Sequence, residues 1–217
     1  MQLKDFIKPR LITSYDIRAR RANFFTSHDS HDPIENFYAK DVCRATSAAP
    51  TYFEPAKIKS LYNQEFTLID GGVYANNPAL CAYAEARKIK FAEAVKDVEK
   101  VDFPSVNDMI IVSVGIGTVL KPYLFEEFEN AGKLQWIAPL IDILLSSNVE
   151  TVDYHLDKMF ETLGERNAKN YHRLMPSLQN ASPEMDNTSK KNTFALIQAG
   201  LEFVNANKEL LHTIAKK

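Results

Sequence analysis

Apolar, β-branched and aromatic residues gather in short segments separated by polar turns, and these segments predict the β-strands of the chain. Near the start, "LITSYDI" (11–17) and "ANFFTS" (22–27) flank the polar "RARR", which predicts a hairpin. "EFTLID" (65–70) predicts a short strand, after an irregular connection over "TYFEPAKI" (51–58). The nearly continuous apolar run "MIIVSVG" (109–115) is typical of a strand covered on both faces, and "YHRLMPSL" (171–178) is the last candidate.

Helices are predicted where a capping residue precedes apolar positions three or four residues apart. Asp32 followed by Pro33 predicts the start of a helical region that runs to 48. Asn77 followed by Pro78 predicts another helix over 79–95, with Ala82, Ala86 and Ile89 along the face that packs. Further helices are expected in three regions: within 133–163, after a cap at Thr188 or Ser189, and over 207–217.

Strands alternate with helices along the chain, and this order predicts an α/β fold. We expect three layers, α/β/α, in which helices cover both sides of a mostly parallel sheet. A chain of 217 residues can bury one sizeable core, so we expect a single domain over 1–217.

Composition narrows the function classes only a little. The 26 basic and 28 acidic residues leave a net charge of −2, so we expect no strong electrostatic attraction of nucleic acid or anionic lipid. Cys43 and Cys81 fall in predicted helices, which favours buried, reduced thiols over a disulfide. The start lacks a signal-peptide core, and the longest apolar stretch (136–145) is interrupted by Pro139 and Asp142. We expect a cytoplasmic chain, or one at the periphery of a membrane.

Asp70 is the main candidate for chemistry, because it ends a predicted strand and is followed directly by Gly71 and Gly72. In α/β sheets, reactive groups gather at the carboxyl ends of strands. The two glycines can adopt angles that side chains forbid, and they let a backbone or a substrate come close. A plain Asp-Gly-Gly turn is the alternative. A hairpin turn would lead into another strand, whereas here the chain continues into a capped helix, which favours a functional role.

Three blocks in order resemble the patatin-like phospholipases, the lipid acyl hydrolases. They are "ATSAAPTYFEP" (45–55), "FTLIDGGVYANNPALCAYAEA" (66–86) and "IIVSVGIGT" (110–118). The later "EMDNTSKKNTFALIQAGLEFV" (184–204) is similar to the closing segment of the family. The resemblance covers about 11–204, with a diffuse middle over 123–163.

The resemblance implies a Ser-Asp dyad, in which a serine attacks the ester carbonyl and an aspartate takes its proton. Asp70 matches the catalytic acid of the dyad, with Gly71 and Gly72 as the active-site loop. Residues expected to line or support the pocket are Ser47, Pro50, Phe53, Asn76, Asn77, Gly115 and Gly117. The implied substrate is a phospholipid or another lipid ester, with transient contact to a membrane surface. No cofactor and no metal are expected.

The serine block of the family is absent from this sequence. A Gly-x-Ser-x-Gly elbow needs glycines two places on either side of a serine, and the glycines at 71, 72, 115, 117, 132, 164 and 200 offer no such pair. The Gly-rich oxyanion segment is missing too. We therefore expect the C-terminal part of the family fold, incomplete at its N-terminal side and inactive alone. A complementary N-terminal segment or a homodimer would complete it. The alternative is a catalytically dead lipid-binding or regulatory module.

Four other features have competing interpretations. "HDSHD" (28–32) could ligate a metal, but a polar loop with Asp32 as helix cap fits better. "GIGT" (115–118) matches no phosphate-binding fingerprint and suits a tight turn. His155 and His172 suggest a Ser-His-Asp triad only if an elbow serine exists. The stretch 136–145 could form an oily flap at a lipid surface, and core packing explains its spacing equally well.

Overall fold

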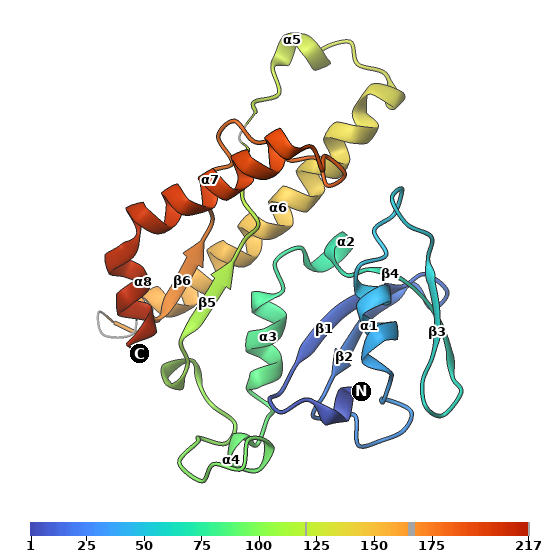
Figure 1. Ribbon diagram of the computed structural model, residues 1–217, viewed down its shortest axis with the longest axis vertical. Coiled ribbons are helices and arrows are strands. Elements are labelled where there is room, and N and C mark those ends of the chain that lie inside the picture. Colours follow the sequence, from blue (N-terminus) through green and yellow to red (C-terminus); the bar gives the residue numbers. More distant parts are fainter. Residues whose placement is uncertain (120, 165–167, 217) are drawn as a thin grey trace. The chain divides into compact units, whose positions relative to one another are not determined.

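The computed structural model describes residues 1–119, 121–164 and 168–216 (Figure 1). The chain forms two compact units. The first contains Met1–Met109 and Ala138–Asn170, and the second contains Ile110–Ile137 and Tyr171–Lys217. Each unit has helices together with its own sheet, so the mixed α/β class is confirmed. The three-layer arrangement and the single domain over 1–217 stay predictions.

The first unit is built on a four-stranded sheet with the strand order β2-β1-β4-β3. Its strands are β1 (Leu11–Asp16), β2 (Arg21–Thr26), β3 (Ala56–Lys59) and β4 (Glu65–Asp70). All three neighbouring pairs are antiparallel, so the expectation of a mostly parallel sheet is wrong here. For the β1–β2 and β3–β4 pairs the reason is the short connection, since a turn of a few residues allows only antiparallel pairing. The β1–β4 pair joins strands that are distant in sequence, so the length of a connection does not set its direction.

The β1–β2 hairpin forms as expected, and Asp16 closes it. The Asp16 carboxylate accepts hydrogen bonds from the backbone N–H groups of Arg18 (2.9 Å) and Ala19 (3.0 Å). Arg20 has a φ of 53°, which the turn requires. The strand β3 falls in a segment expected to be irregular, and it pairs with β4 from Ala56 opposite Leu68 onward.

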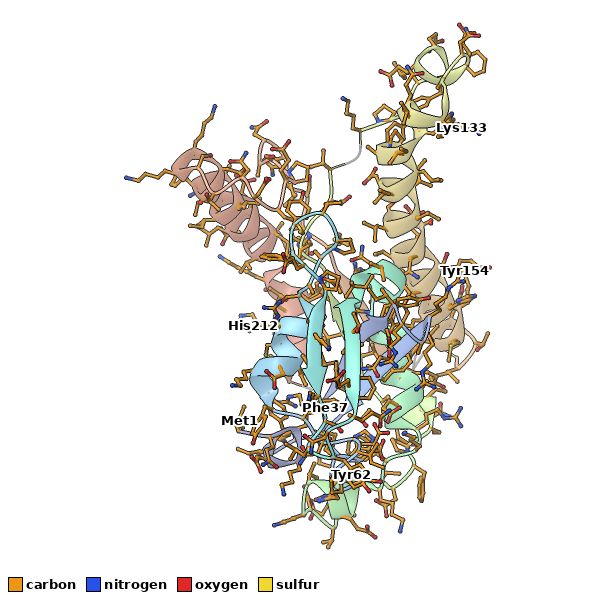
Figure 2. The ribbon with its side chains drawn as sticks, turned by 90° about the vertical axis from the view of Figure 1, so that its right-hand side faces the viewer. Met1, Phe37, Tyr62, Lys133, Tyr154 and His212 are labelled. Atoms are coloured by element: carbon orange, nitrogen blue, oxygen red, sulfur yellow. The ribbon has the colours of Figure 1, made fainter. Side chains whose placement is uncertain are left out.

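The core of the first unit lies between one face of this sheet and α1 (Ala39–Thr46), which packs on β1, β3 and β4. Phe37, labelled in Figure 2, packs edge-on against Phe25 and Phe66, with ring centroids 5.0 and 5.4 Å apart. The other members of this buried cluster are Leu3, Val42, Ala45, Ala48, Ala56, Ile58 and Leu68. Phe66 and Leu68 alternate along β4 and so share its buried face.

The helix start predicted at Asp32 is wrong, because α1 begins only at Ala39. The Asp32 carboxylate does accept a backbone hydrogen bond, from Ile34 (2.9 Å), but it closes a turn. Buried Ser30 secures the same segment by donating its hydroxyl to the carbonyls of Thr26 and Glu35. The residue chemistry of a helix cap and of a turn is the same, so the sequence did not separate the two.

Three short α-helices of the first unit follow β4: α2 (Gly72–Ala75), α3 (Ala79–Ala86) and α4 (Phe91–Ala94). The described part of this unit also contains 3₁₀ helices at Leu3–Asp5, before β1, and at Val106–Asp108 and Ala168–Asn170. The single helix expected over 79–95 is thus two helices, since Lys90 leaves the helical conformation (ψ 87°) and the carbonyl of Ile89 accepts a hydrogen bond from the N–H of Phe103. Ala82, expected on the packing face, is exposed.

A long helix, α6 (Lys133–Glu161), provides the helical region expected over 133–163. From Ala138 onward it belongs to the first unit, where Val152, Leu156 and Phe160 are buried. Among the described residues, none of the helices combines the length and the hydropathy needed to cross a bilayer.

The second unit pairs β5 (Ile111–Val114) with β6 (Tyr171–Leu174) in parallel. Its helices are α5 (Phe125–Phe128), α7 (Lys190–Ala206) and α8 (Lys208–Ala215). The predicted cap at Ser189 is confirmed, since its hydroxyl accepts from the backbone N–H of Asn192 (3.2 Å). The last residue of the helix expected over 207–217 lies outside the described residues. Val112 and Val114 are exposed, so the expectation that this strand is covered on both faces is wrong for this chain.

Both cysteines lie on helices and are free, as expected. Cys43 on α1 is exposed, so the expectation of a buried thiol is wrong for it. Cys81 on α3 is half-buried, and burial raises the pKa of its thiol.

Candidate active site

Asp70 occupies the last position of β4, at the carboxyl end of the strand, as the sequence predicts. Beyond the end of β3, the backbone N–H of Asp70 bonds to the carbonyl of Ala48 (3.0 Å). The segment after α1 therefore takes over as the neighbour of β4 at this point. This contact brings the first of the quoted sequence blocks, 45–55, beside the Asp-Gly-Gly loop.

The Asp70 carboxylate is partly exposed and lightly held. Its Oδ1 accepts a hydrogen bond from the backbone N–H of Gly72 at 2.6 Å. Within the described part of the chain, neither carboxylate oxygen has another hydrogen-bond or ion-pair partner. The side chain is therefore fixed from one side, and its second oxygen is available to a further group.

Gly71 is required because the backbone of β1 passes close to it, and not because its own backbone angles are unusual. Its φ of −71° and ψ of −22° are open to any residue, which corrects the expectation that the glycines use forbidden angles. A Cβ at this position would lie 2.5 Å from the carbonyl oxygen and 2.6 Å from the carbonyl carbon of Thr13 on β1. At Gly72, a Cβ would lie 3.1 Å from Asp70 Oδ1. The backbone of the neighbouring strand explains the first glycine, and the Asp70 carboxylate itself crowds the second.

The helix α2 follows at once and is held from two sides. On one side the Tyr74 hydroxyl donates to the carbonyl of Asn23 (3.2 Å), and its ring packs against Tyr15 and Phe24. Burial, with the nearby Cys81 thiolate, raises the pKa of Tyr74, so this hydroxyl stays protonated. The other side is held by α6.

Asn148 of α6 binds the end of α2 with both atoms of its amide. Its Oδ1 accepts from the backbone N–H of Asn76 (3.2 Å), and its Nδ2 donates to the carbonyl of Tyr74 (2.8 Å). The Asn76 side chain adds a third link, donating to the carbonyl of Leu145 (3.3 Å). Sequence reasoning missed Asn148, and a lone asparagine in a helical segment gives no signal that it meets a loop 72 residues away.

The other predicted pocket residues divide between the two units. Ser47 is exposed just after α1 and donates its hydroxyl to the carbonyl of Cys43 (2.8 Å). Pro50 and Phe53 are exposed in the turn that follows. Asn77 is buried, and its Oδ1 accepts from the N–H of Ala79 (3.2 Å), which is the predicted cap of α3.

Gly115 and Gly117 belong to the second unit, directly after β5. The N–H of Gly115 bonds to the carbonyl of Leu174 (2.8 Å), and Gly117 has a φ of 113°, which favours glycine. The tight turn expected for "GIGT" is wrong, because the ladder continues: the N–H of Thr118 bonds to the carbonyl of Pro176 (3.0 Å), and Thr118 forms a parallel bridge with Ser177. The predicted role of both glycines beside Asp70 stays a prediction.

Ser14 stands directly opposite Asp70 across β1 and β4. The N–H of Ile17 bonds to the carbonyl of Thr67, so these two residues form a hydrogen-bonded pair. Hydrogen-bonded and non-hydrogen-bonded pairs alternate along an antiparallel ladder, so Ser14 and Asp70 form a non-hydrogen-bonded pair. Side chains come closest together in pairs of this kind. Ser14 is nevertheless fully buried, and its hydroxyl accepts from the Asn23 side chain (3.2 Å). A lipid ester cannot reach it, so Ser14 is unsuited to be a nucleophile.

The "HDSHD" segment contributes two residues to an ion-pair network. His28 Nε2 lies 2.8 Å from Glu85 Oε1 on α3 and 3.6 Å from Asp29 Oδ2. The nearest nitrogen and oxygen atoms of these three side chains lie within 4.8 Å of one another. The Lys88 ammonium lies 2.8 Å from Glu85 and 3.3 Å from Asp29, so it already supplies the cation between the two carboxylates. Burial alone would raise the pKa of Asp29, but the Thr26 hydroxyl and Lys88 outweigh burial and lower it. The network joins the end of β2 to α3.

The two histidines of the triad alternative belong to different units. His155 is exposed on α6 of the first unit, where its ring packs on Tyr154 with centroids 6.0 Å apart. His172 lies in β6 of the second unit. No elbow serine accompanies either of them in the sequence.

Comparison with known proteins relates the chain to one family of proteins. The family model described as patatin-like phospholipase matches residues 1–83, which include β1 to β4, Asp70 and α2. Curated patatin-like proteins match far more of the chain. The resemblance found in the sequence is confirmed, and the chain is related to the patatin-like phospholipases over most of its length.

Three relatives illustrate the extent of the match. Patatin-like protein 2 of Oryza sativa subsp. indica is 31% identical over 215 residues, 91% of this chain and 52% of the relative. Patatin-like protein 3 of Arabidopsis thaliana is 30% identical over 205 residues, covering 88% and 47%. Probable inactive patatin-3-Kuras 1 of Solanum tuberosum is 32% identical over 200 residues, covering 87% and 52%. The chain spans about half the length of the curated relatives it matches.

Proposed function

We propose that this chain supplies the aspartate of a Ser-Asp dyad that hydrolyses carboxylic esters of lipids. The observation that carries the proposal is the state of Asp70: a partly exposed carboxylate at the end of β4, with one oxygen bonded to Gly72 and the other available. The relation to patatin-like phospholipases supports the choice of lipid esters as the substrate class.

In the proposed reaction, a serine hydroxyl attacks the ester carbonyl while Asp70 accepts its proton. The tetrahedral intermediate collapses, and the alcohol half of the lipid leaves with that proton. Water then attacks the acyl-serine, Asp70 accepts a proton again, and the fatty acid is released as the serine is restored. An aspartate is a weak base towards a hydroxyl, so proximity and oxyanion donors have to supply much of the rate enhancement.

The serine would come from outside this chain. No Gly-x-Ser-x-Gly pattern occurs in the sequence, and the serine next to Asp70, Ser14, is buried. We call the missing part the elbow segment: a patatin-like segment that carries the Gly-rich oxyanion loop and the elbow serine. Gly71, Gly72 and the segment from Ser47 to Phe53 would shape the pocket that the two parts share.

The second unit offers a surface for such a segment. The N–H of Gly115 bonds to β6, so by alternation the backbone groups of Val112 and Val114 face the other edge of β5. Among the described residues no strand pairs with that edge, and Val114 is 71% exposed. An apolar, unpaired strand edge can pair with a further strand, either from the elbow segment or from a second copy of this chain. Solution scattering that finds a monodisperse monomer, with slow amide exchange along β5, would argue against both.

Contact with a lipid surface is part of the proposal. On α6, Leu140, Ile141 and Leu144 share one side of the helix and are exposed, so core packing does not account for them in this chain. No basic residue lies within 134–145, which favours neutral over anionic lipid. Flotation with phosphatidylcholine vesicles should carry the wild type upward and leave Leu140→Glu behind. Equal flotation of the two proteins would remove this contact from the account.

The chain alone is expected to hydrolyse neither phospholipids nor p-nitrophenyl esters, because the base is present without an attacking hydroxyl. The test is a steady-state assay of the purified chain, together with its Asp70→Asn variant. Robust turnover that disappears in Asp70→Asn and survives replacement of every serine in turn would overturn the dyad.

A second candidate is a catalytically dead module that binds lipid or regulates another protein. The observation in its favour is the 32% identity to a relative whose printed name is probable inactive patatin. The two candidates separate when the elbow segment is added: the enzyme gains turnover, whereas the dead module binds vesicles and stays inactive.

A further inference from the structure

The loop after Asp70 depends on a very short helix. The helix α2 spans only Gly72–Ala75, a single turn, which is too short to be stable alone in water. Its last carbonyls and the N–H groups that follow need partners from elsewhere in the fold. Whatever holds α2 in place therefore also fixes the start of this helix, where Gly72 is located.

Asn148 meets this need at the end of α2. Its amide donates to the carbonyl of Tyr74 and accepts from the N–H of Asn76, at 2.8 and 3.2 Å, so one side chain binds a donor and an acceptor together. The helix that carries Asn148 is anchored in the first unit through buried Leu156 and Phe160. The core of the first unit therefore fixes the position of Asn148, and Asn148 in turn can fix the position of α2.

The start of α2 meets the candidate base. The N–H of Gly72, the first residue of this helix, donates to Asp70 Oδ1 at 2.6 Å. One end of α2 is thus bound by Asn148 and the other end binds the Asp70 carboxylate. With only one turn between the two ends, a displacement at one end is transmitted to the other.

We propose that Asn148 is a positioning residue for Asp70, acting through the single turn of α2. Its catalytic meaning rests on the function proposed above, whereas its effect on the carboxylate is a property of this chain alone. Without the Asn148 amide, α2 loosens and the Gly72 N–H no longer stays on Asp70 Oδ1. The Gly72 amide proton then exchanges faster with water, and the Asp70 carboxylate is no longer held in one orientation.

The test is amide hydrogen exchange followed by NMR in the isolated chain, read at Gly72. We expect the Gly72 amide to exchange about tenfold faster in Asn148→Ala, because α2 opens more often, while the amides of β1 and β2 keep their wild-type rates. The matched control is Ser147→Ala, because Ser147 is the exposed neighbour whose hydroxyl donates to the carbonyl of Leu144 in its own helix. Its Gly72 amide should exchange at the wild-type rate.

A variant with lowered thermal stability and an unchanged exchange rate at the Gly72 amide would show that Asn148 is merely structural and would overturn the proposal. If Asn148→Ala does not fold, Asn148→Ser takes its place, since a serine is too short to make both bonds. In the enzyme completed with the elbow segment, Asn148→Ala should lower kcat with little change in KM. If the completed protein proves inactive, the proposed function fails, while the exchange rate of the Gly72 amide still decides the role of Asn148.

Discussion

Asp70→Asn is expected to lower the kcat of the completed enzyme, this chain joined with the elbow segment, by a factor of about 10²–10⁴. The asparagine side chain has the same shape, and its Oδ1 can still accept the hydrogen bond from Gly72. It cannot accept the serine proton at neutral pH. The change therefore removes proton transfer while it keeps the geometry of the loop, and KM should change little. Steady-state hydrolysis of a phospholipid and of a p-nitrophenyl ester measures both constants.

Asp32→Asn is the matched control for this change. Asp32 is exposed in the first unit, and its carboxylate accepts a backbone bond from Ile34 that an asparagine also makes. It should leave kcat and KM at wild-type values. Wild-type turnover in Asp70→Asn, with the same lipid substrates, would contradict the assignment of Asp70 as the base.

Gly71→Ala is expected to be the most damaging single change to the fold of the first unit. The added Cβ would lie 2.5 Å from the Thr13 carbonyl oxygen, a distance that no rotation of a side chain can relieve. Either β1 or the Asp70 loop has to move, and β1 is an inner strand of the four-stranded sheet. Overpacking of this kind costs about 1–3 kcal/mol or more in the free energy of unfolding. Urea unfolding followed by circular dichroism measures the loss.

Gly200→Ala provides the contrast with Gly71→Ala. Gly200 lies inside α7, and a Cβ there meets no atom within 4 Å, so the change should stabilise that helix by about 0.5–1 kcal/mol. Opposite signs for the two substitutions are the expected result. A Gly71→Ala protein as stable as the wild type would mean that the close approach to β1 is not what this glycine is for.

Local patterns predicted most strands well, because β-branched and aromatic residues gather in short segments between polar turns. Four of the predicted segments contain β1, β4, β5 and β6, and the second matches β2 to within one residue. β3 was missed because it directly follows Pro55 and has the sequence AKIK, which offers only two apolar residues. The pairing direction could not be read from these patterns, since it depends on which strands meet and on the length of the turns.

The candidate site was partly visible in the sequence. Asp70 could be placed at a strand end because the apolar run of β4 stops there and two glycines follow. The reason for Gly71 could not be foreseen, since it lies in the backbone of Thr13, which is distant in sequence. Asn148 was invisible for the same reason: its importance comes from contacts with Tyr74 and Asn76 that only the folded chain makes.

The central claim is that Asp70 serves a serine located outside this chain. The most direct measurement is intact mass spectrometry of the completed enzyme, assembled from two separate chains and treated with a fluorophosphonate that labels activated serines. The account predicts one adduct on the elbow segment, none on this chain, and slower labelling in Asp70→Asn. An adduct on any serine of this chain, formed at the same rate with and without the elbow segment, would contradict it.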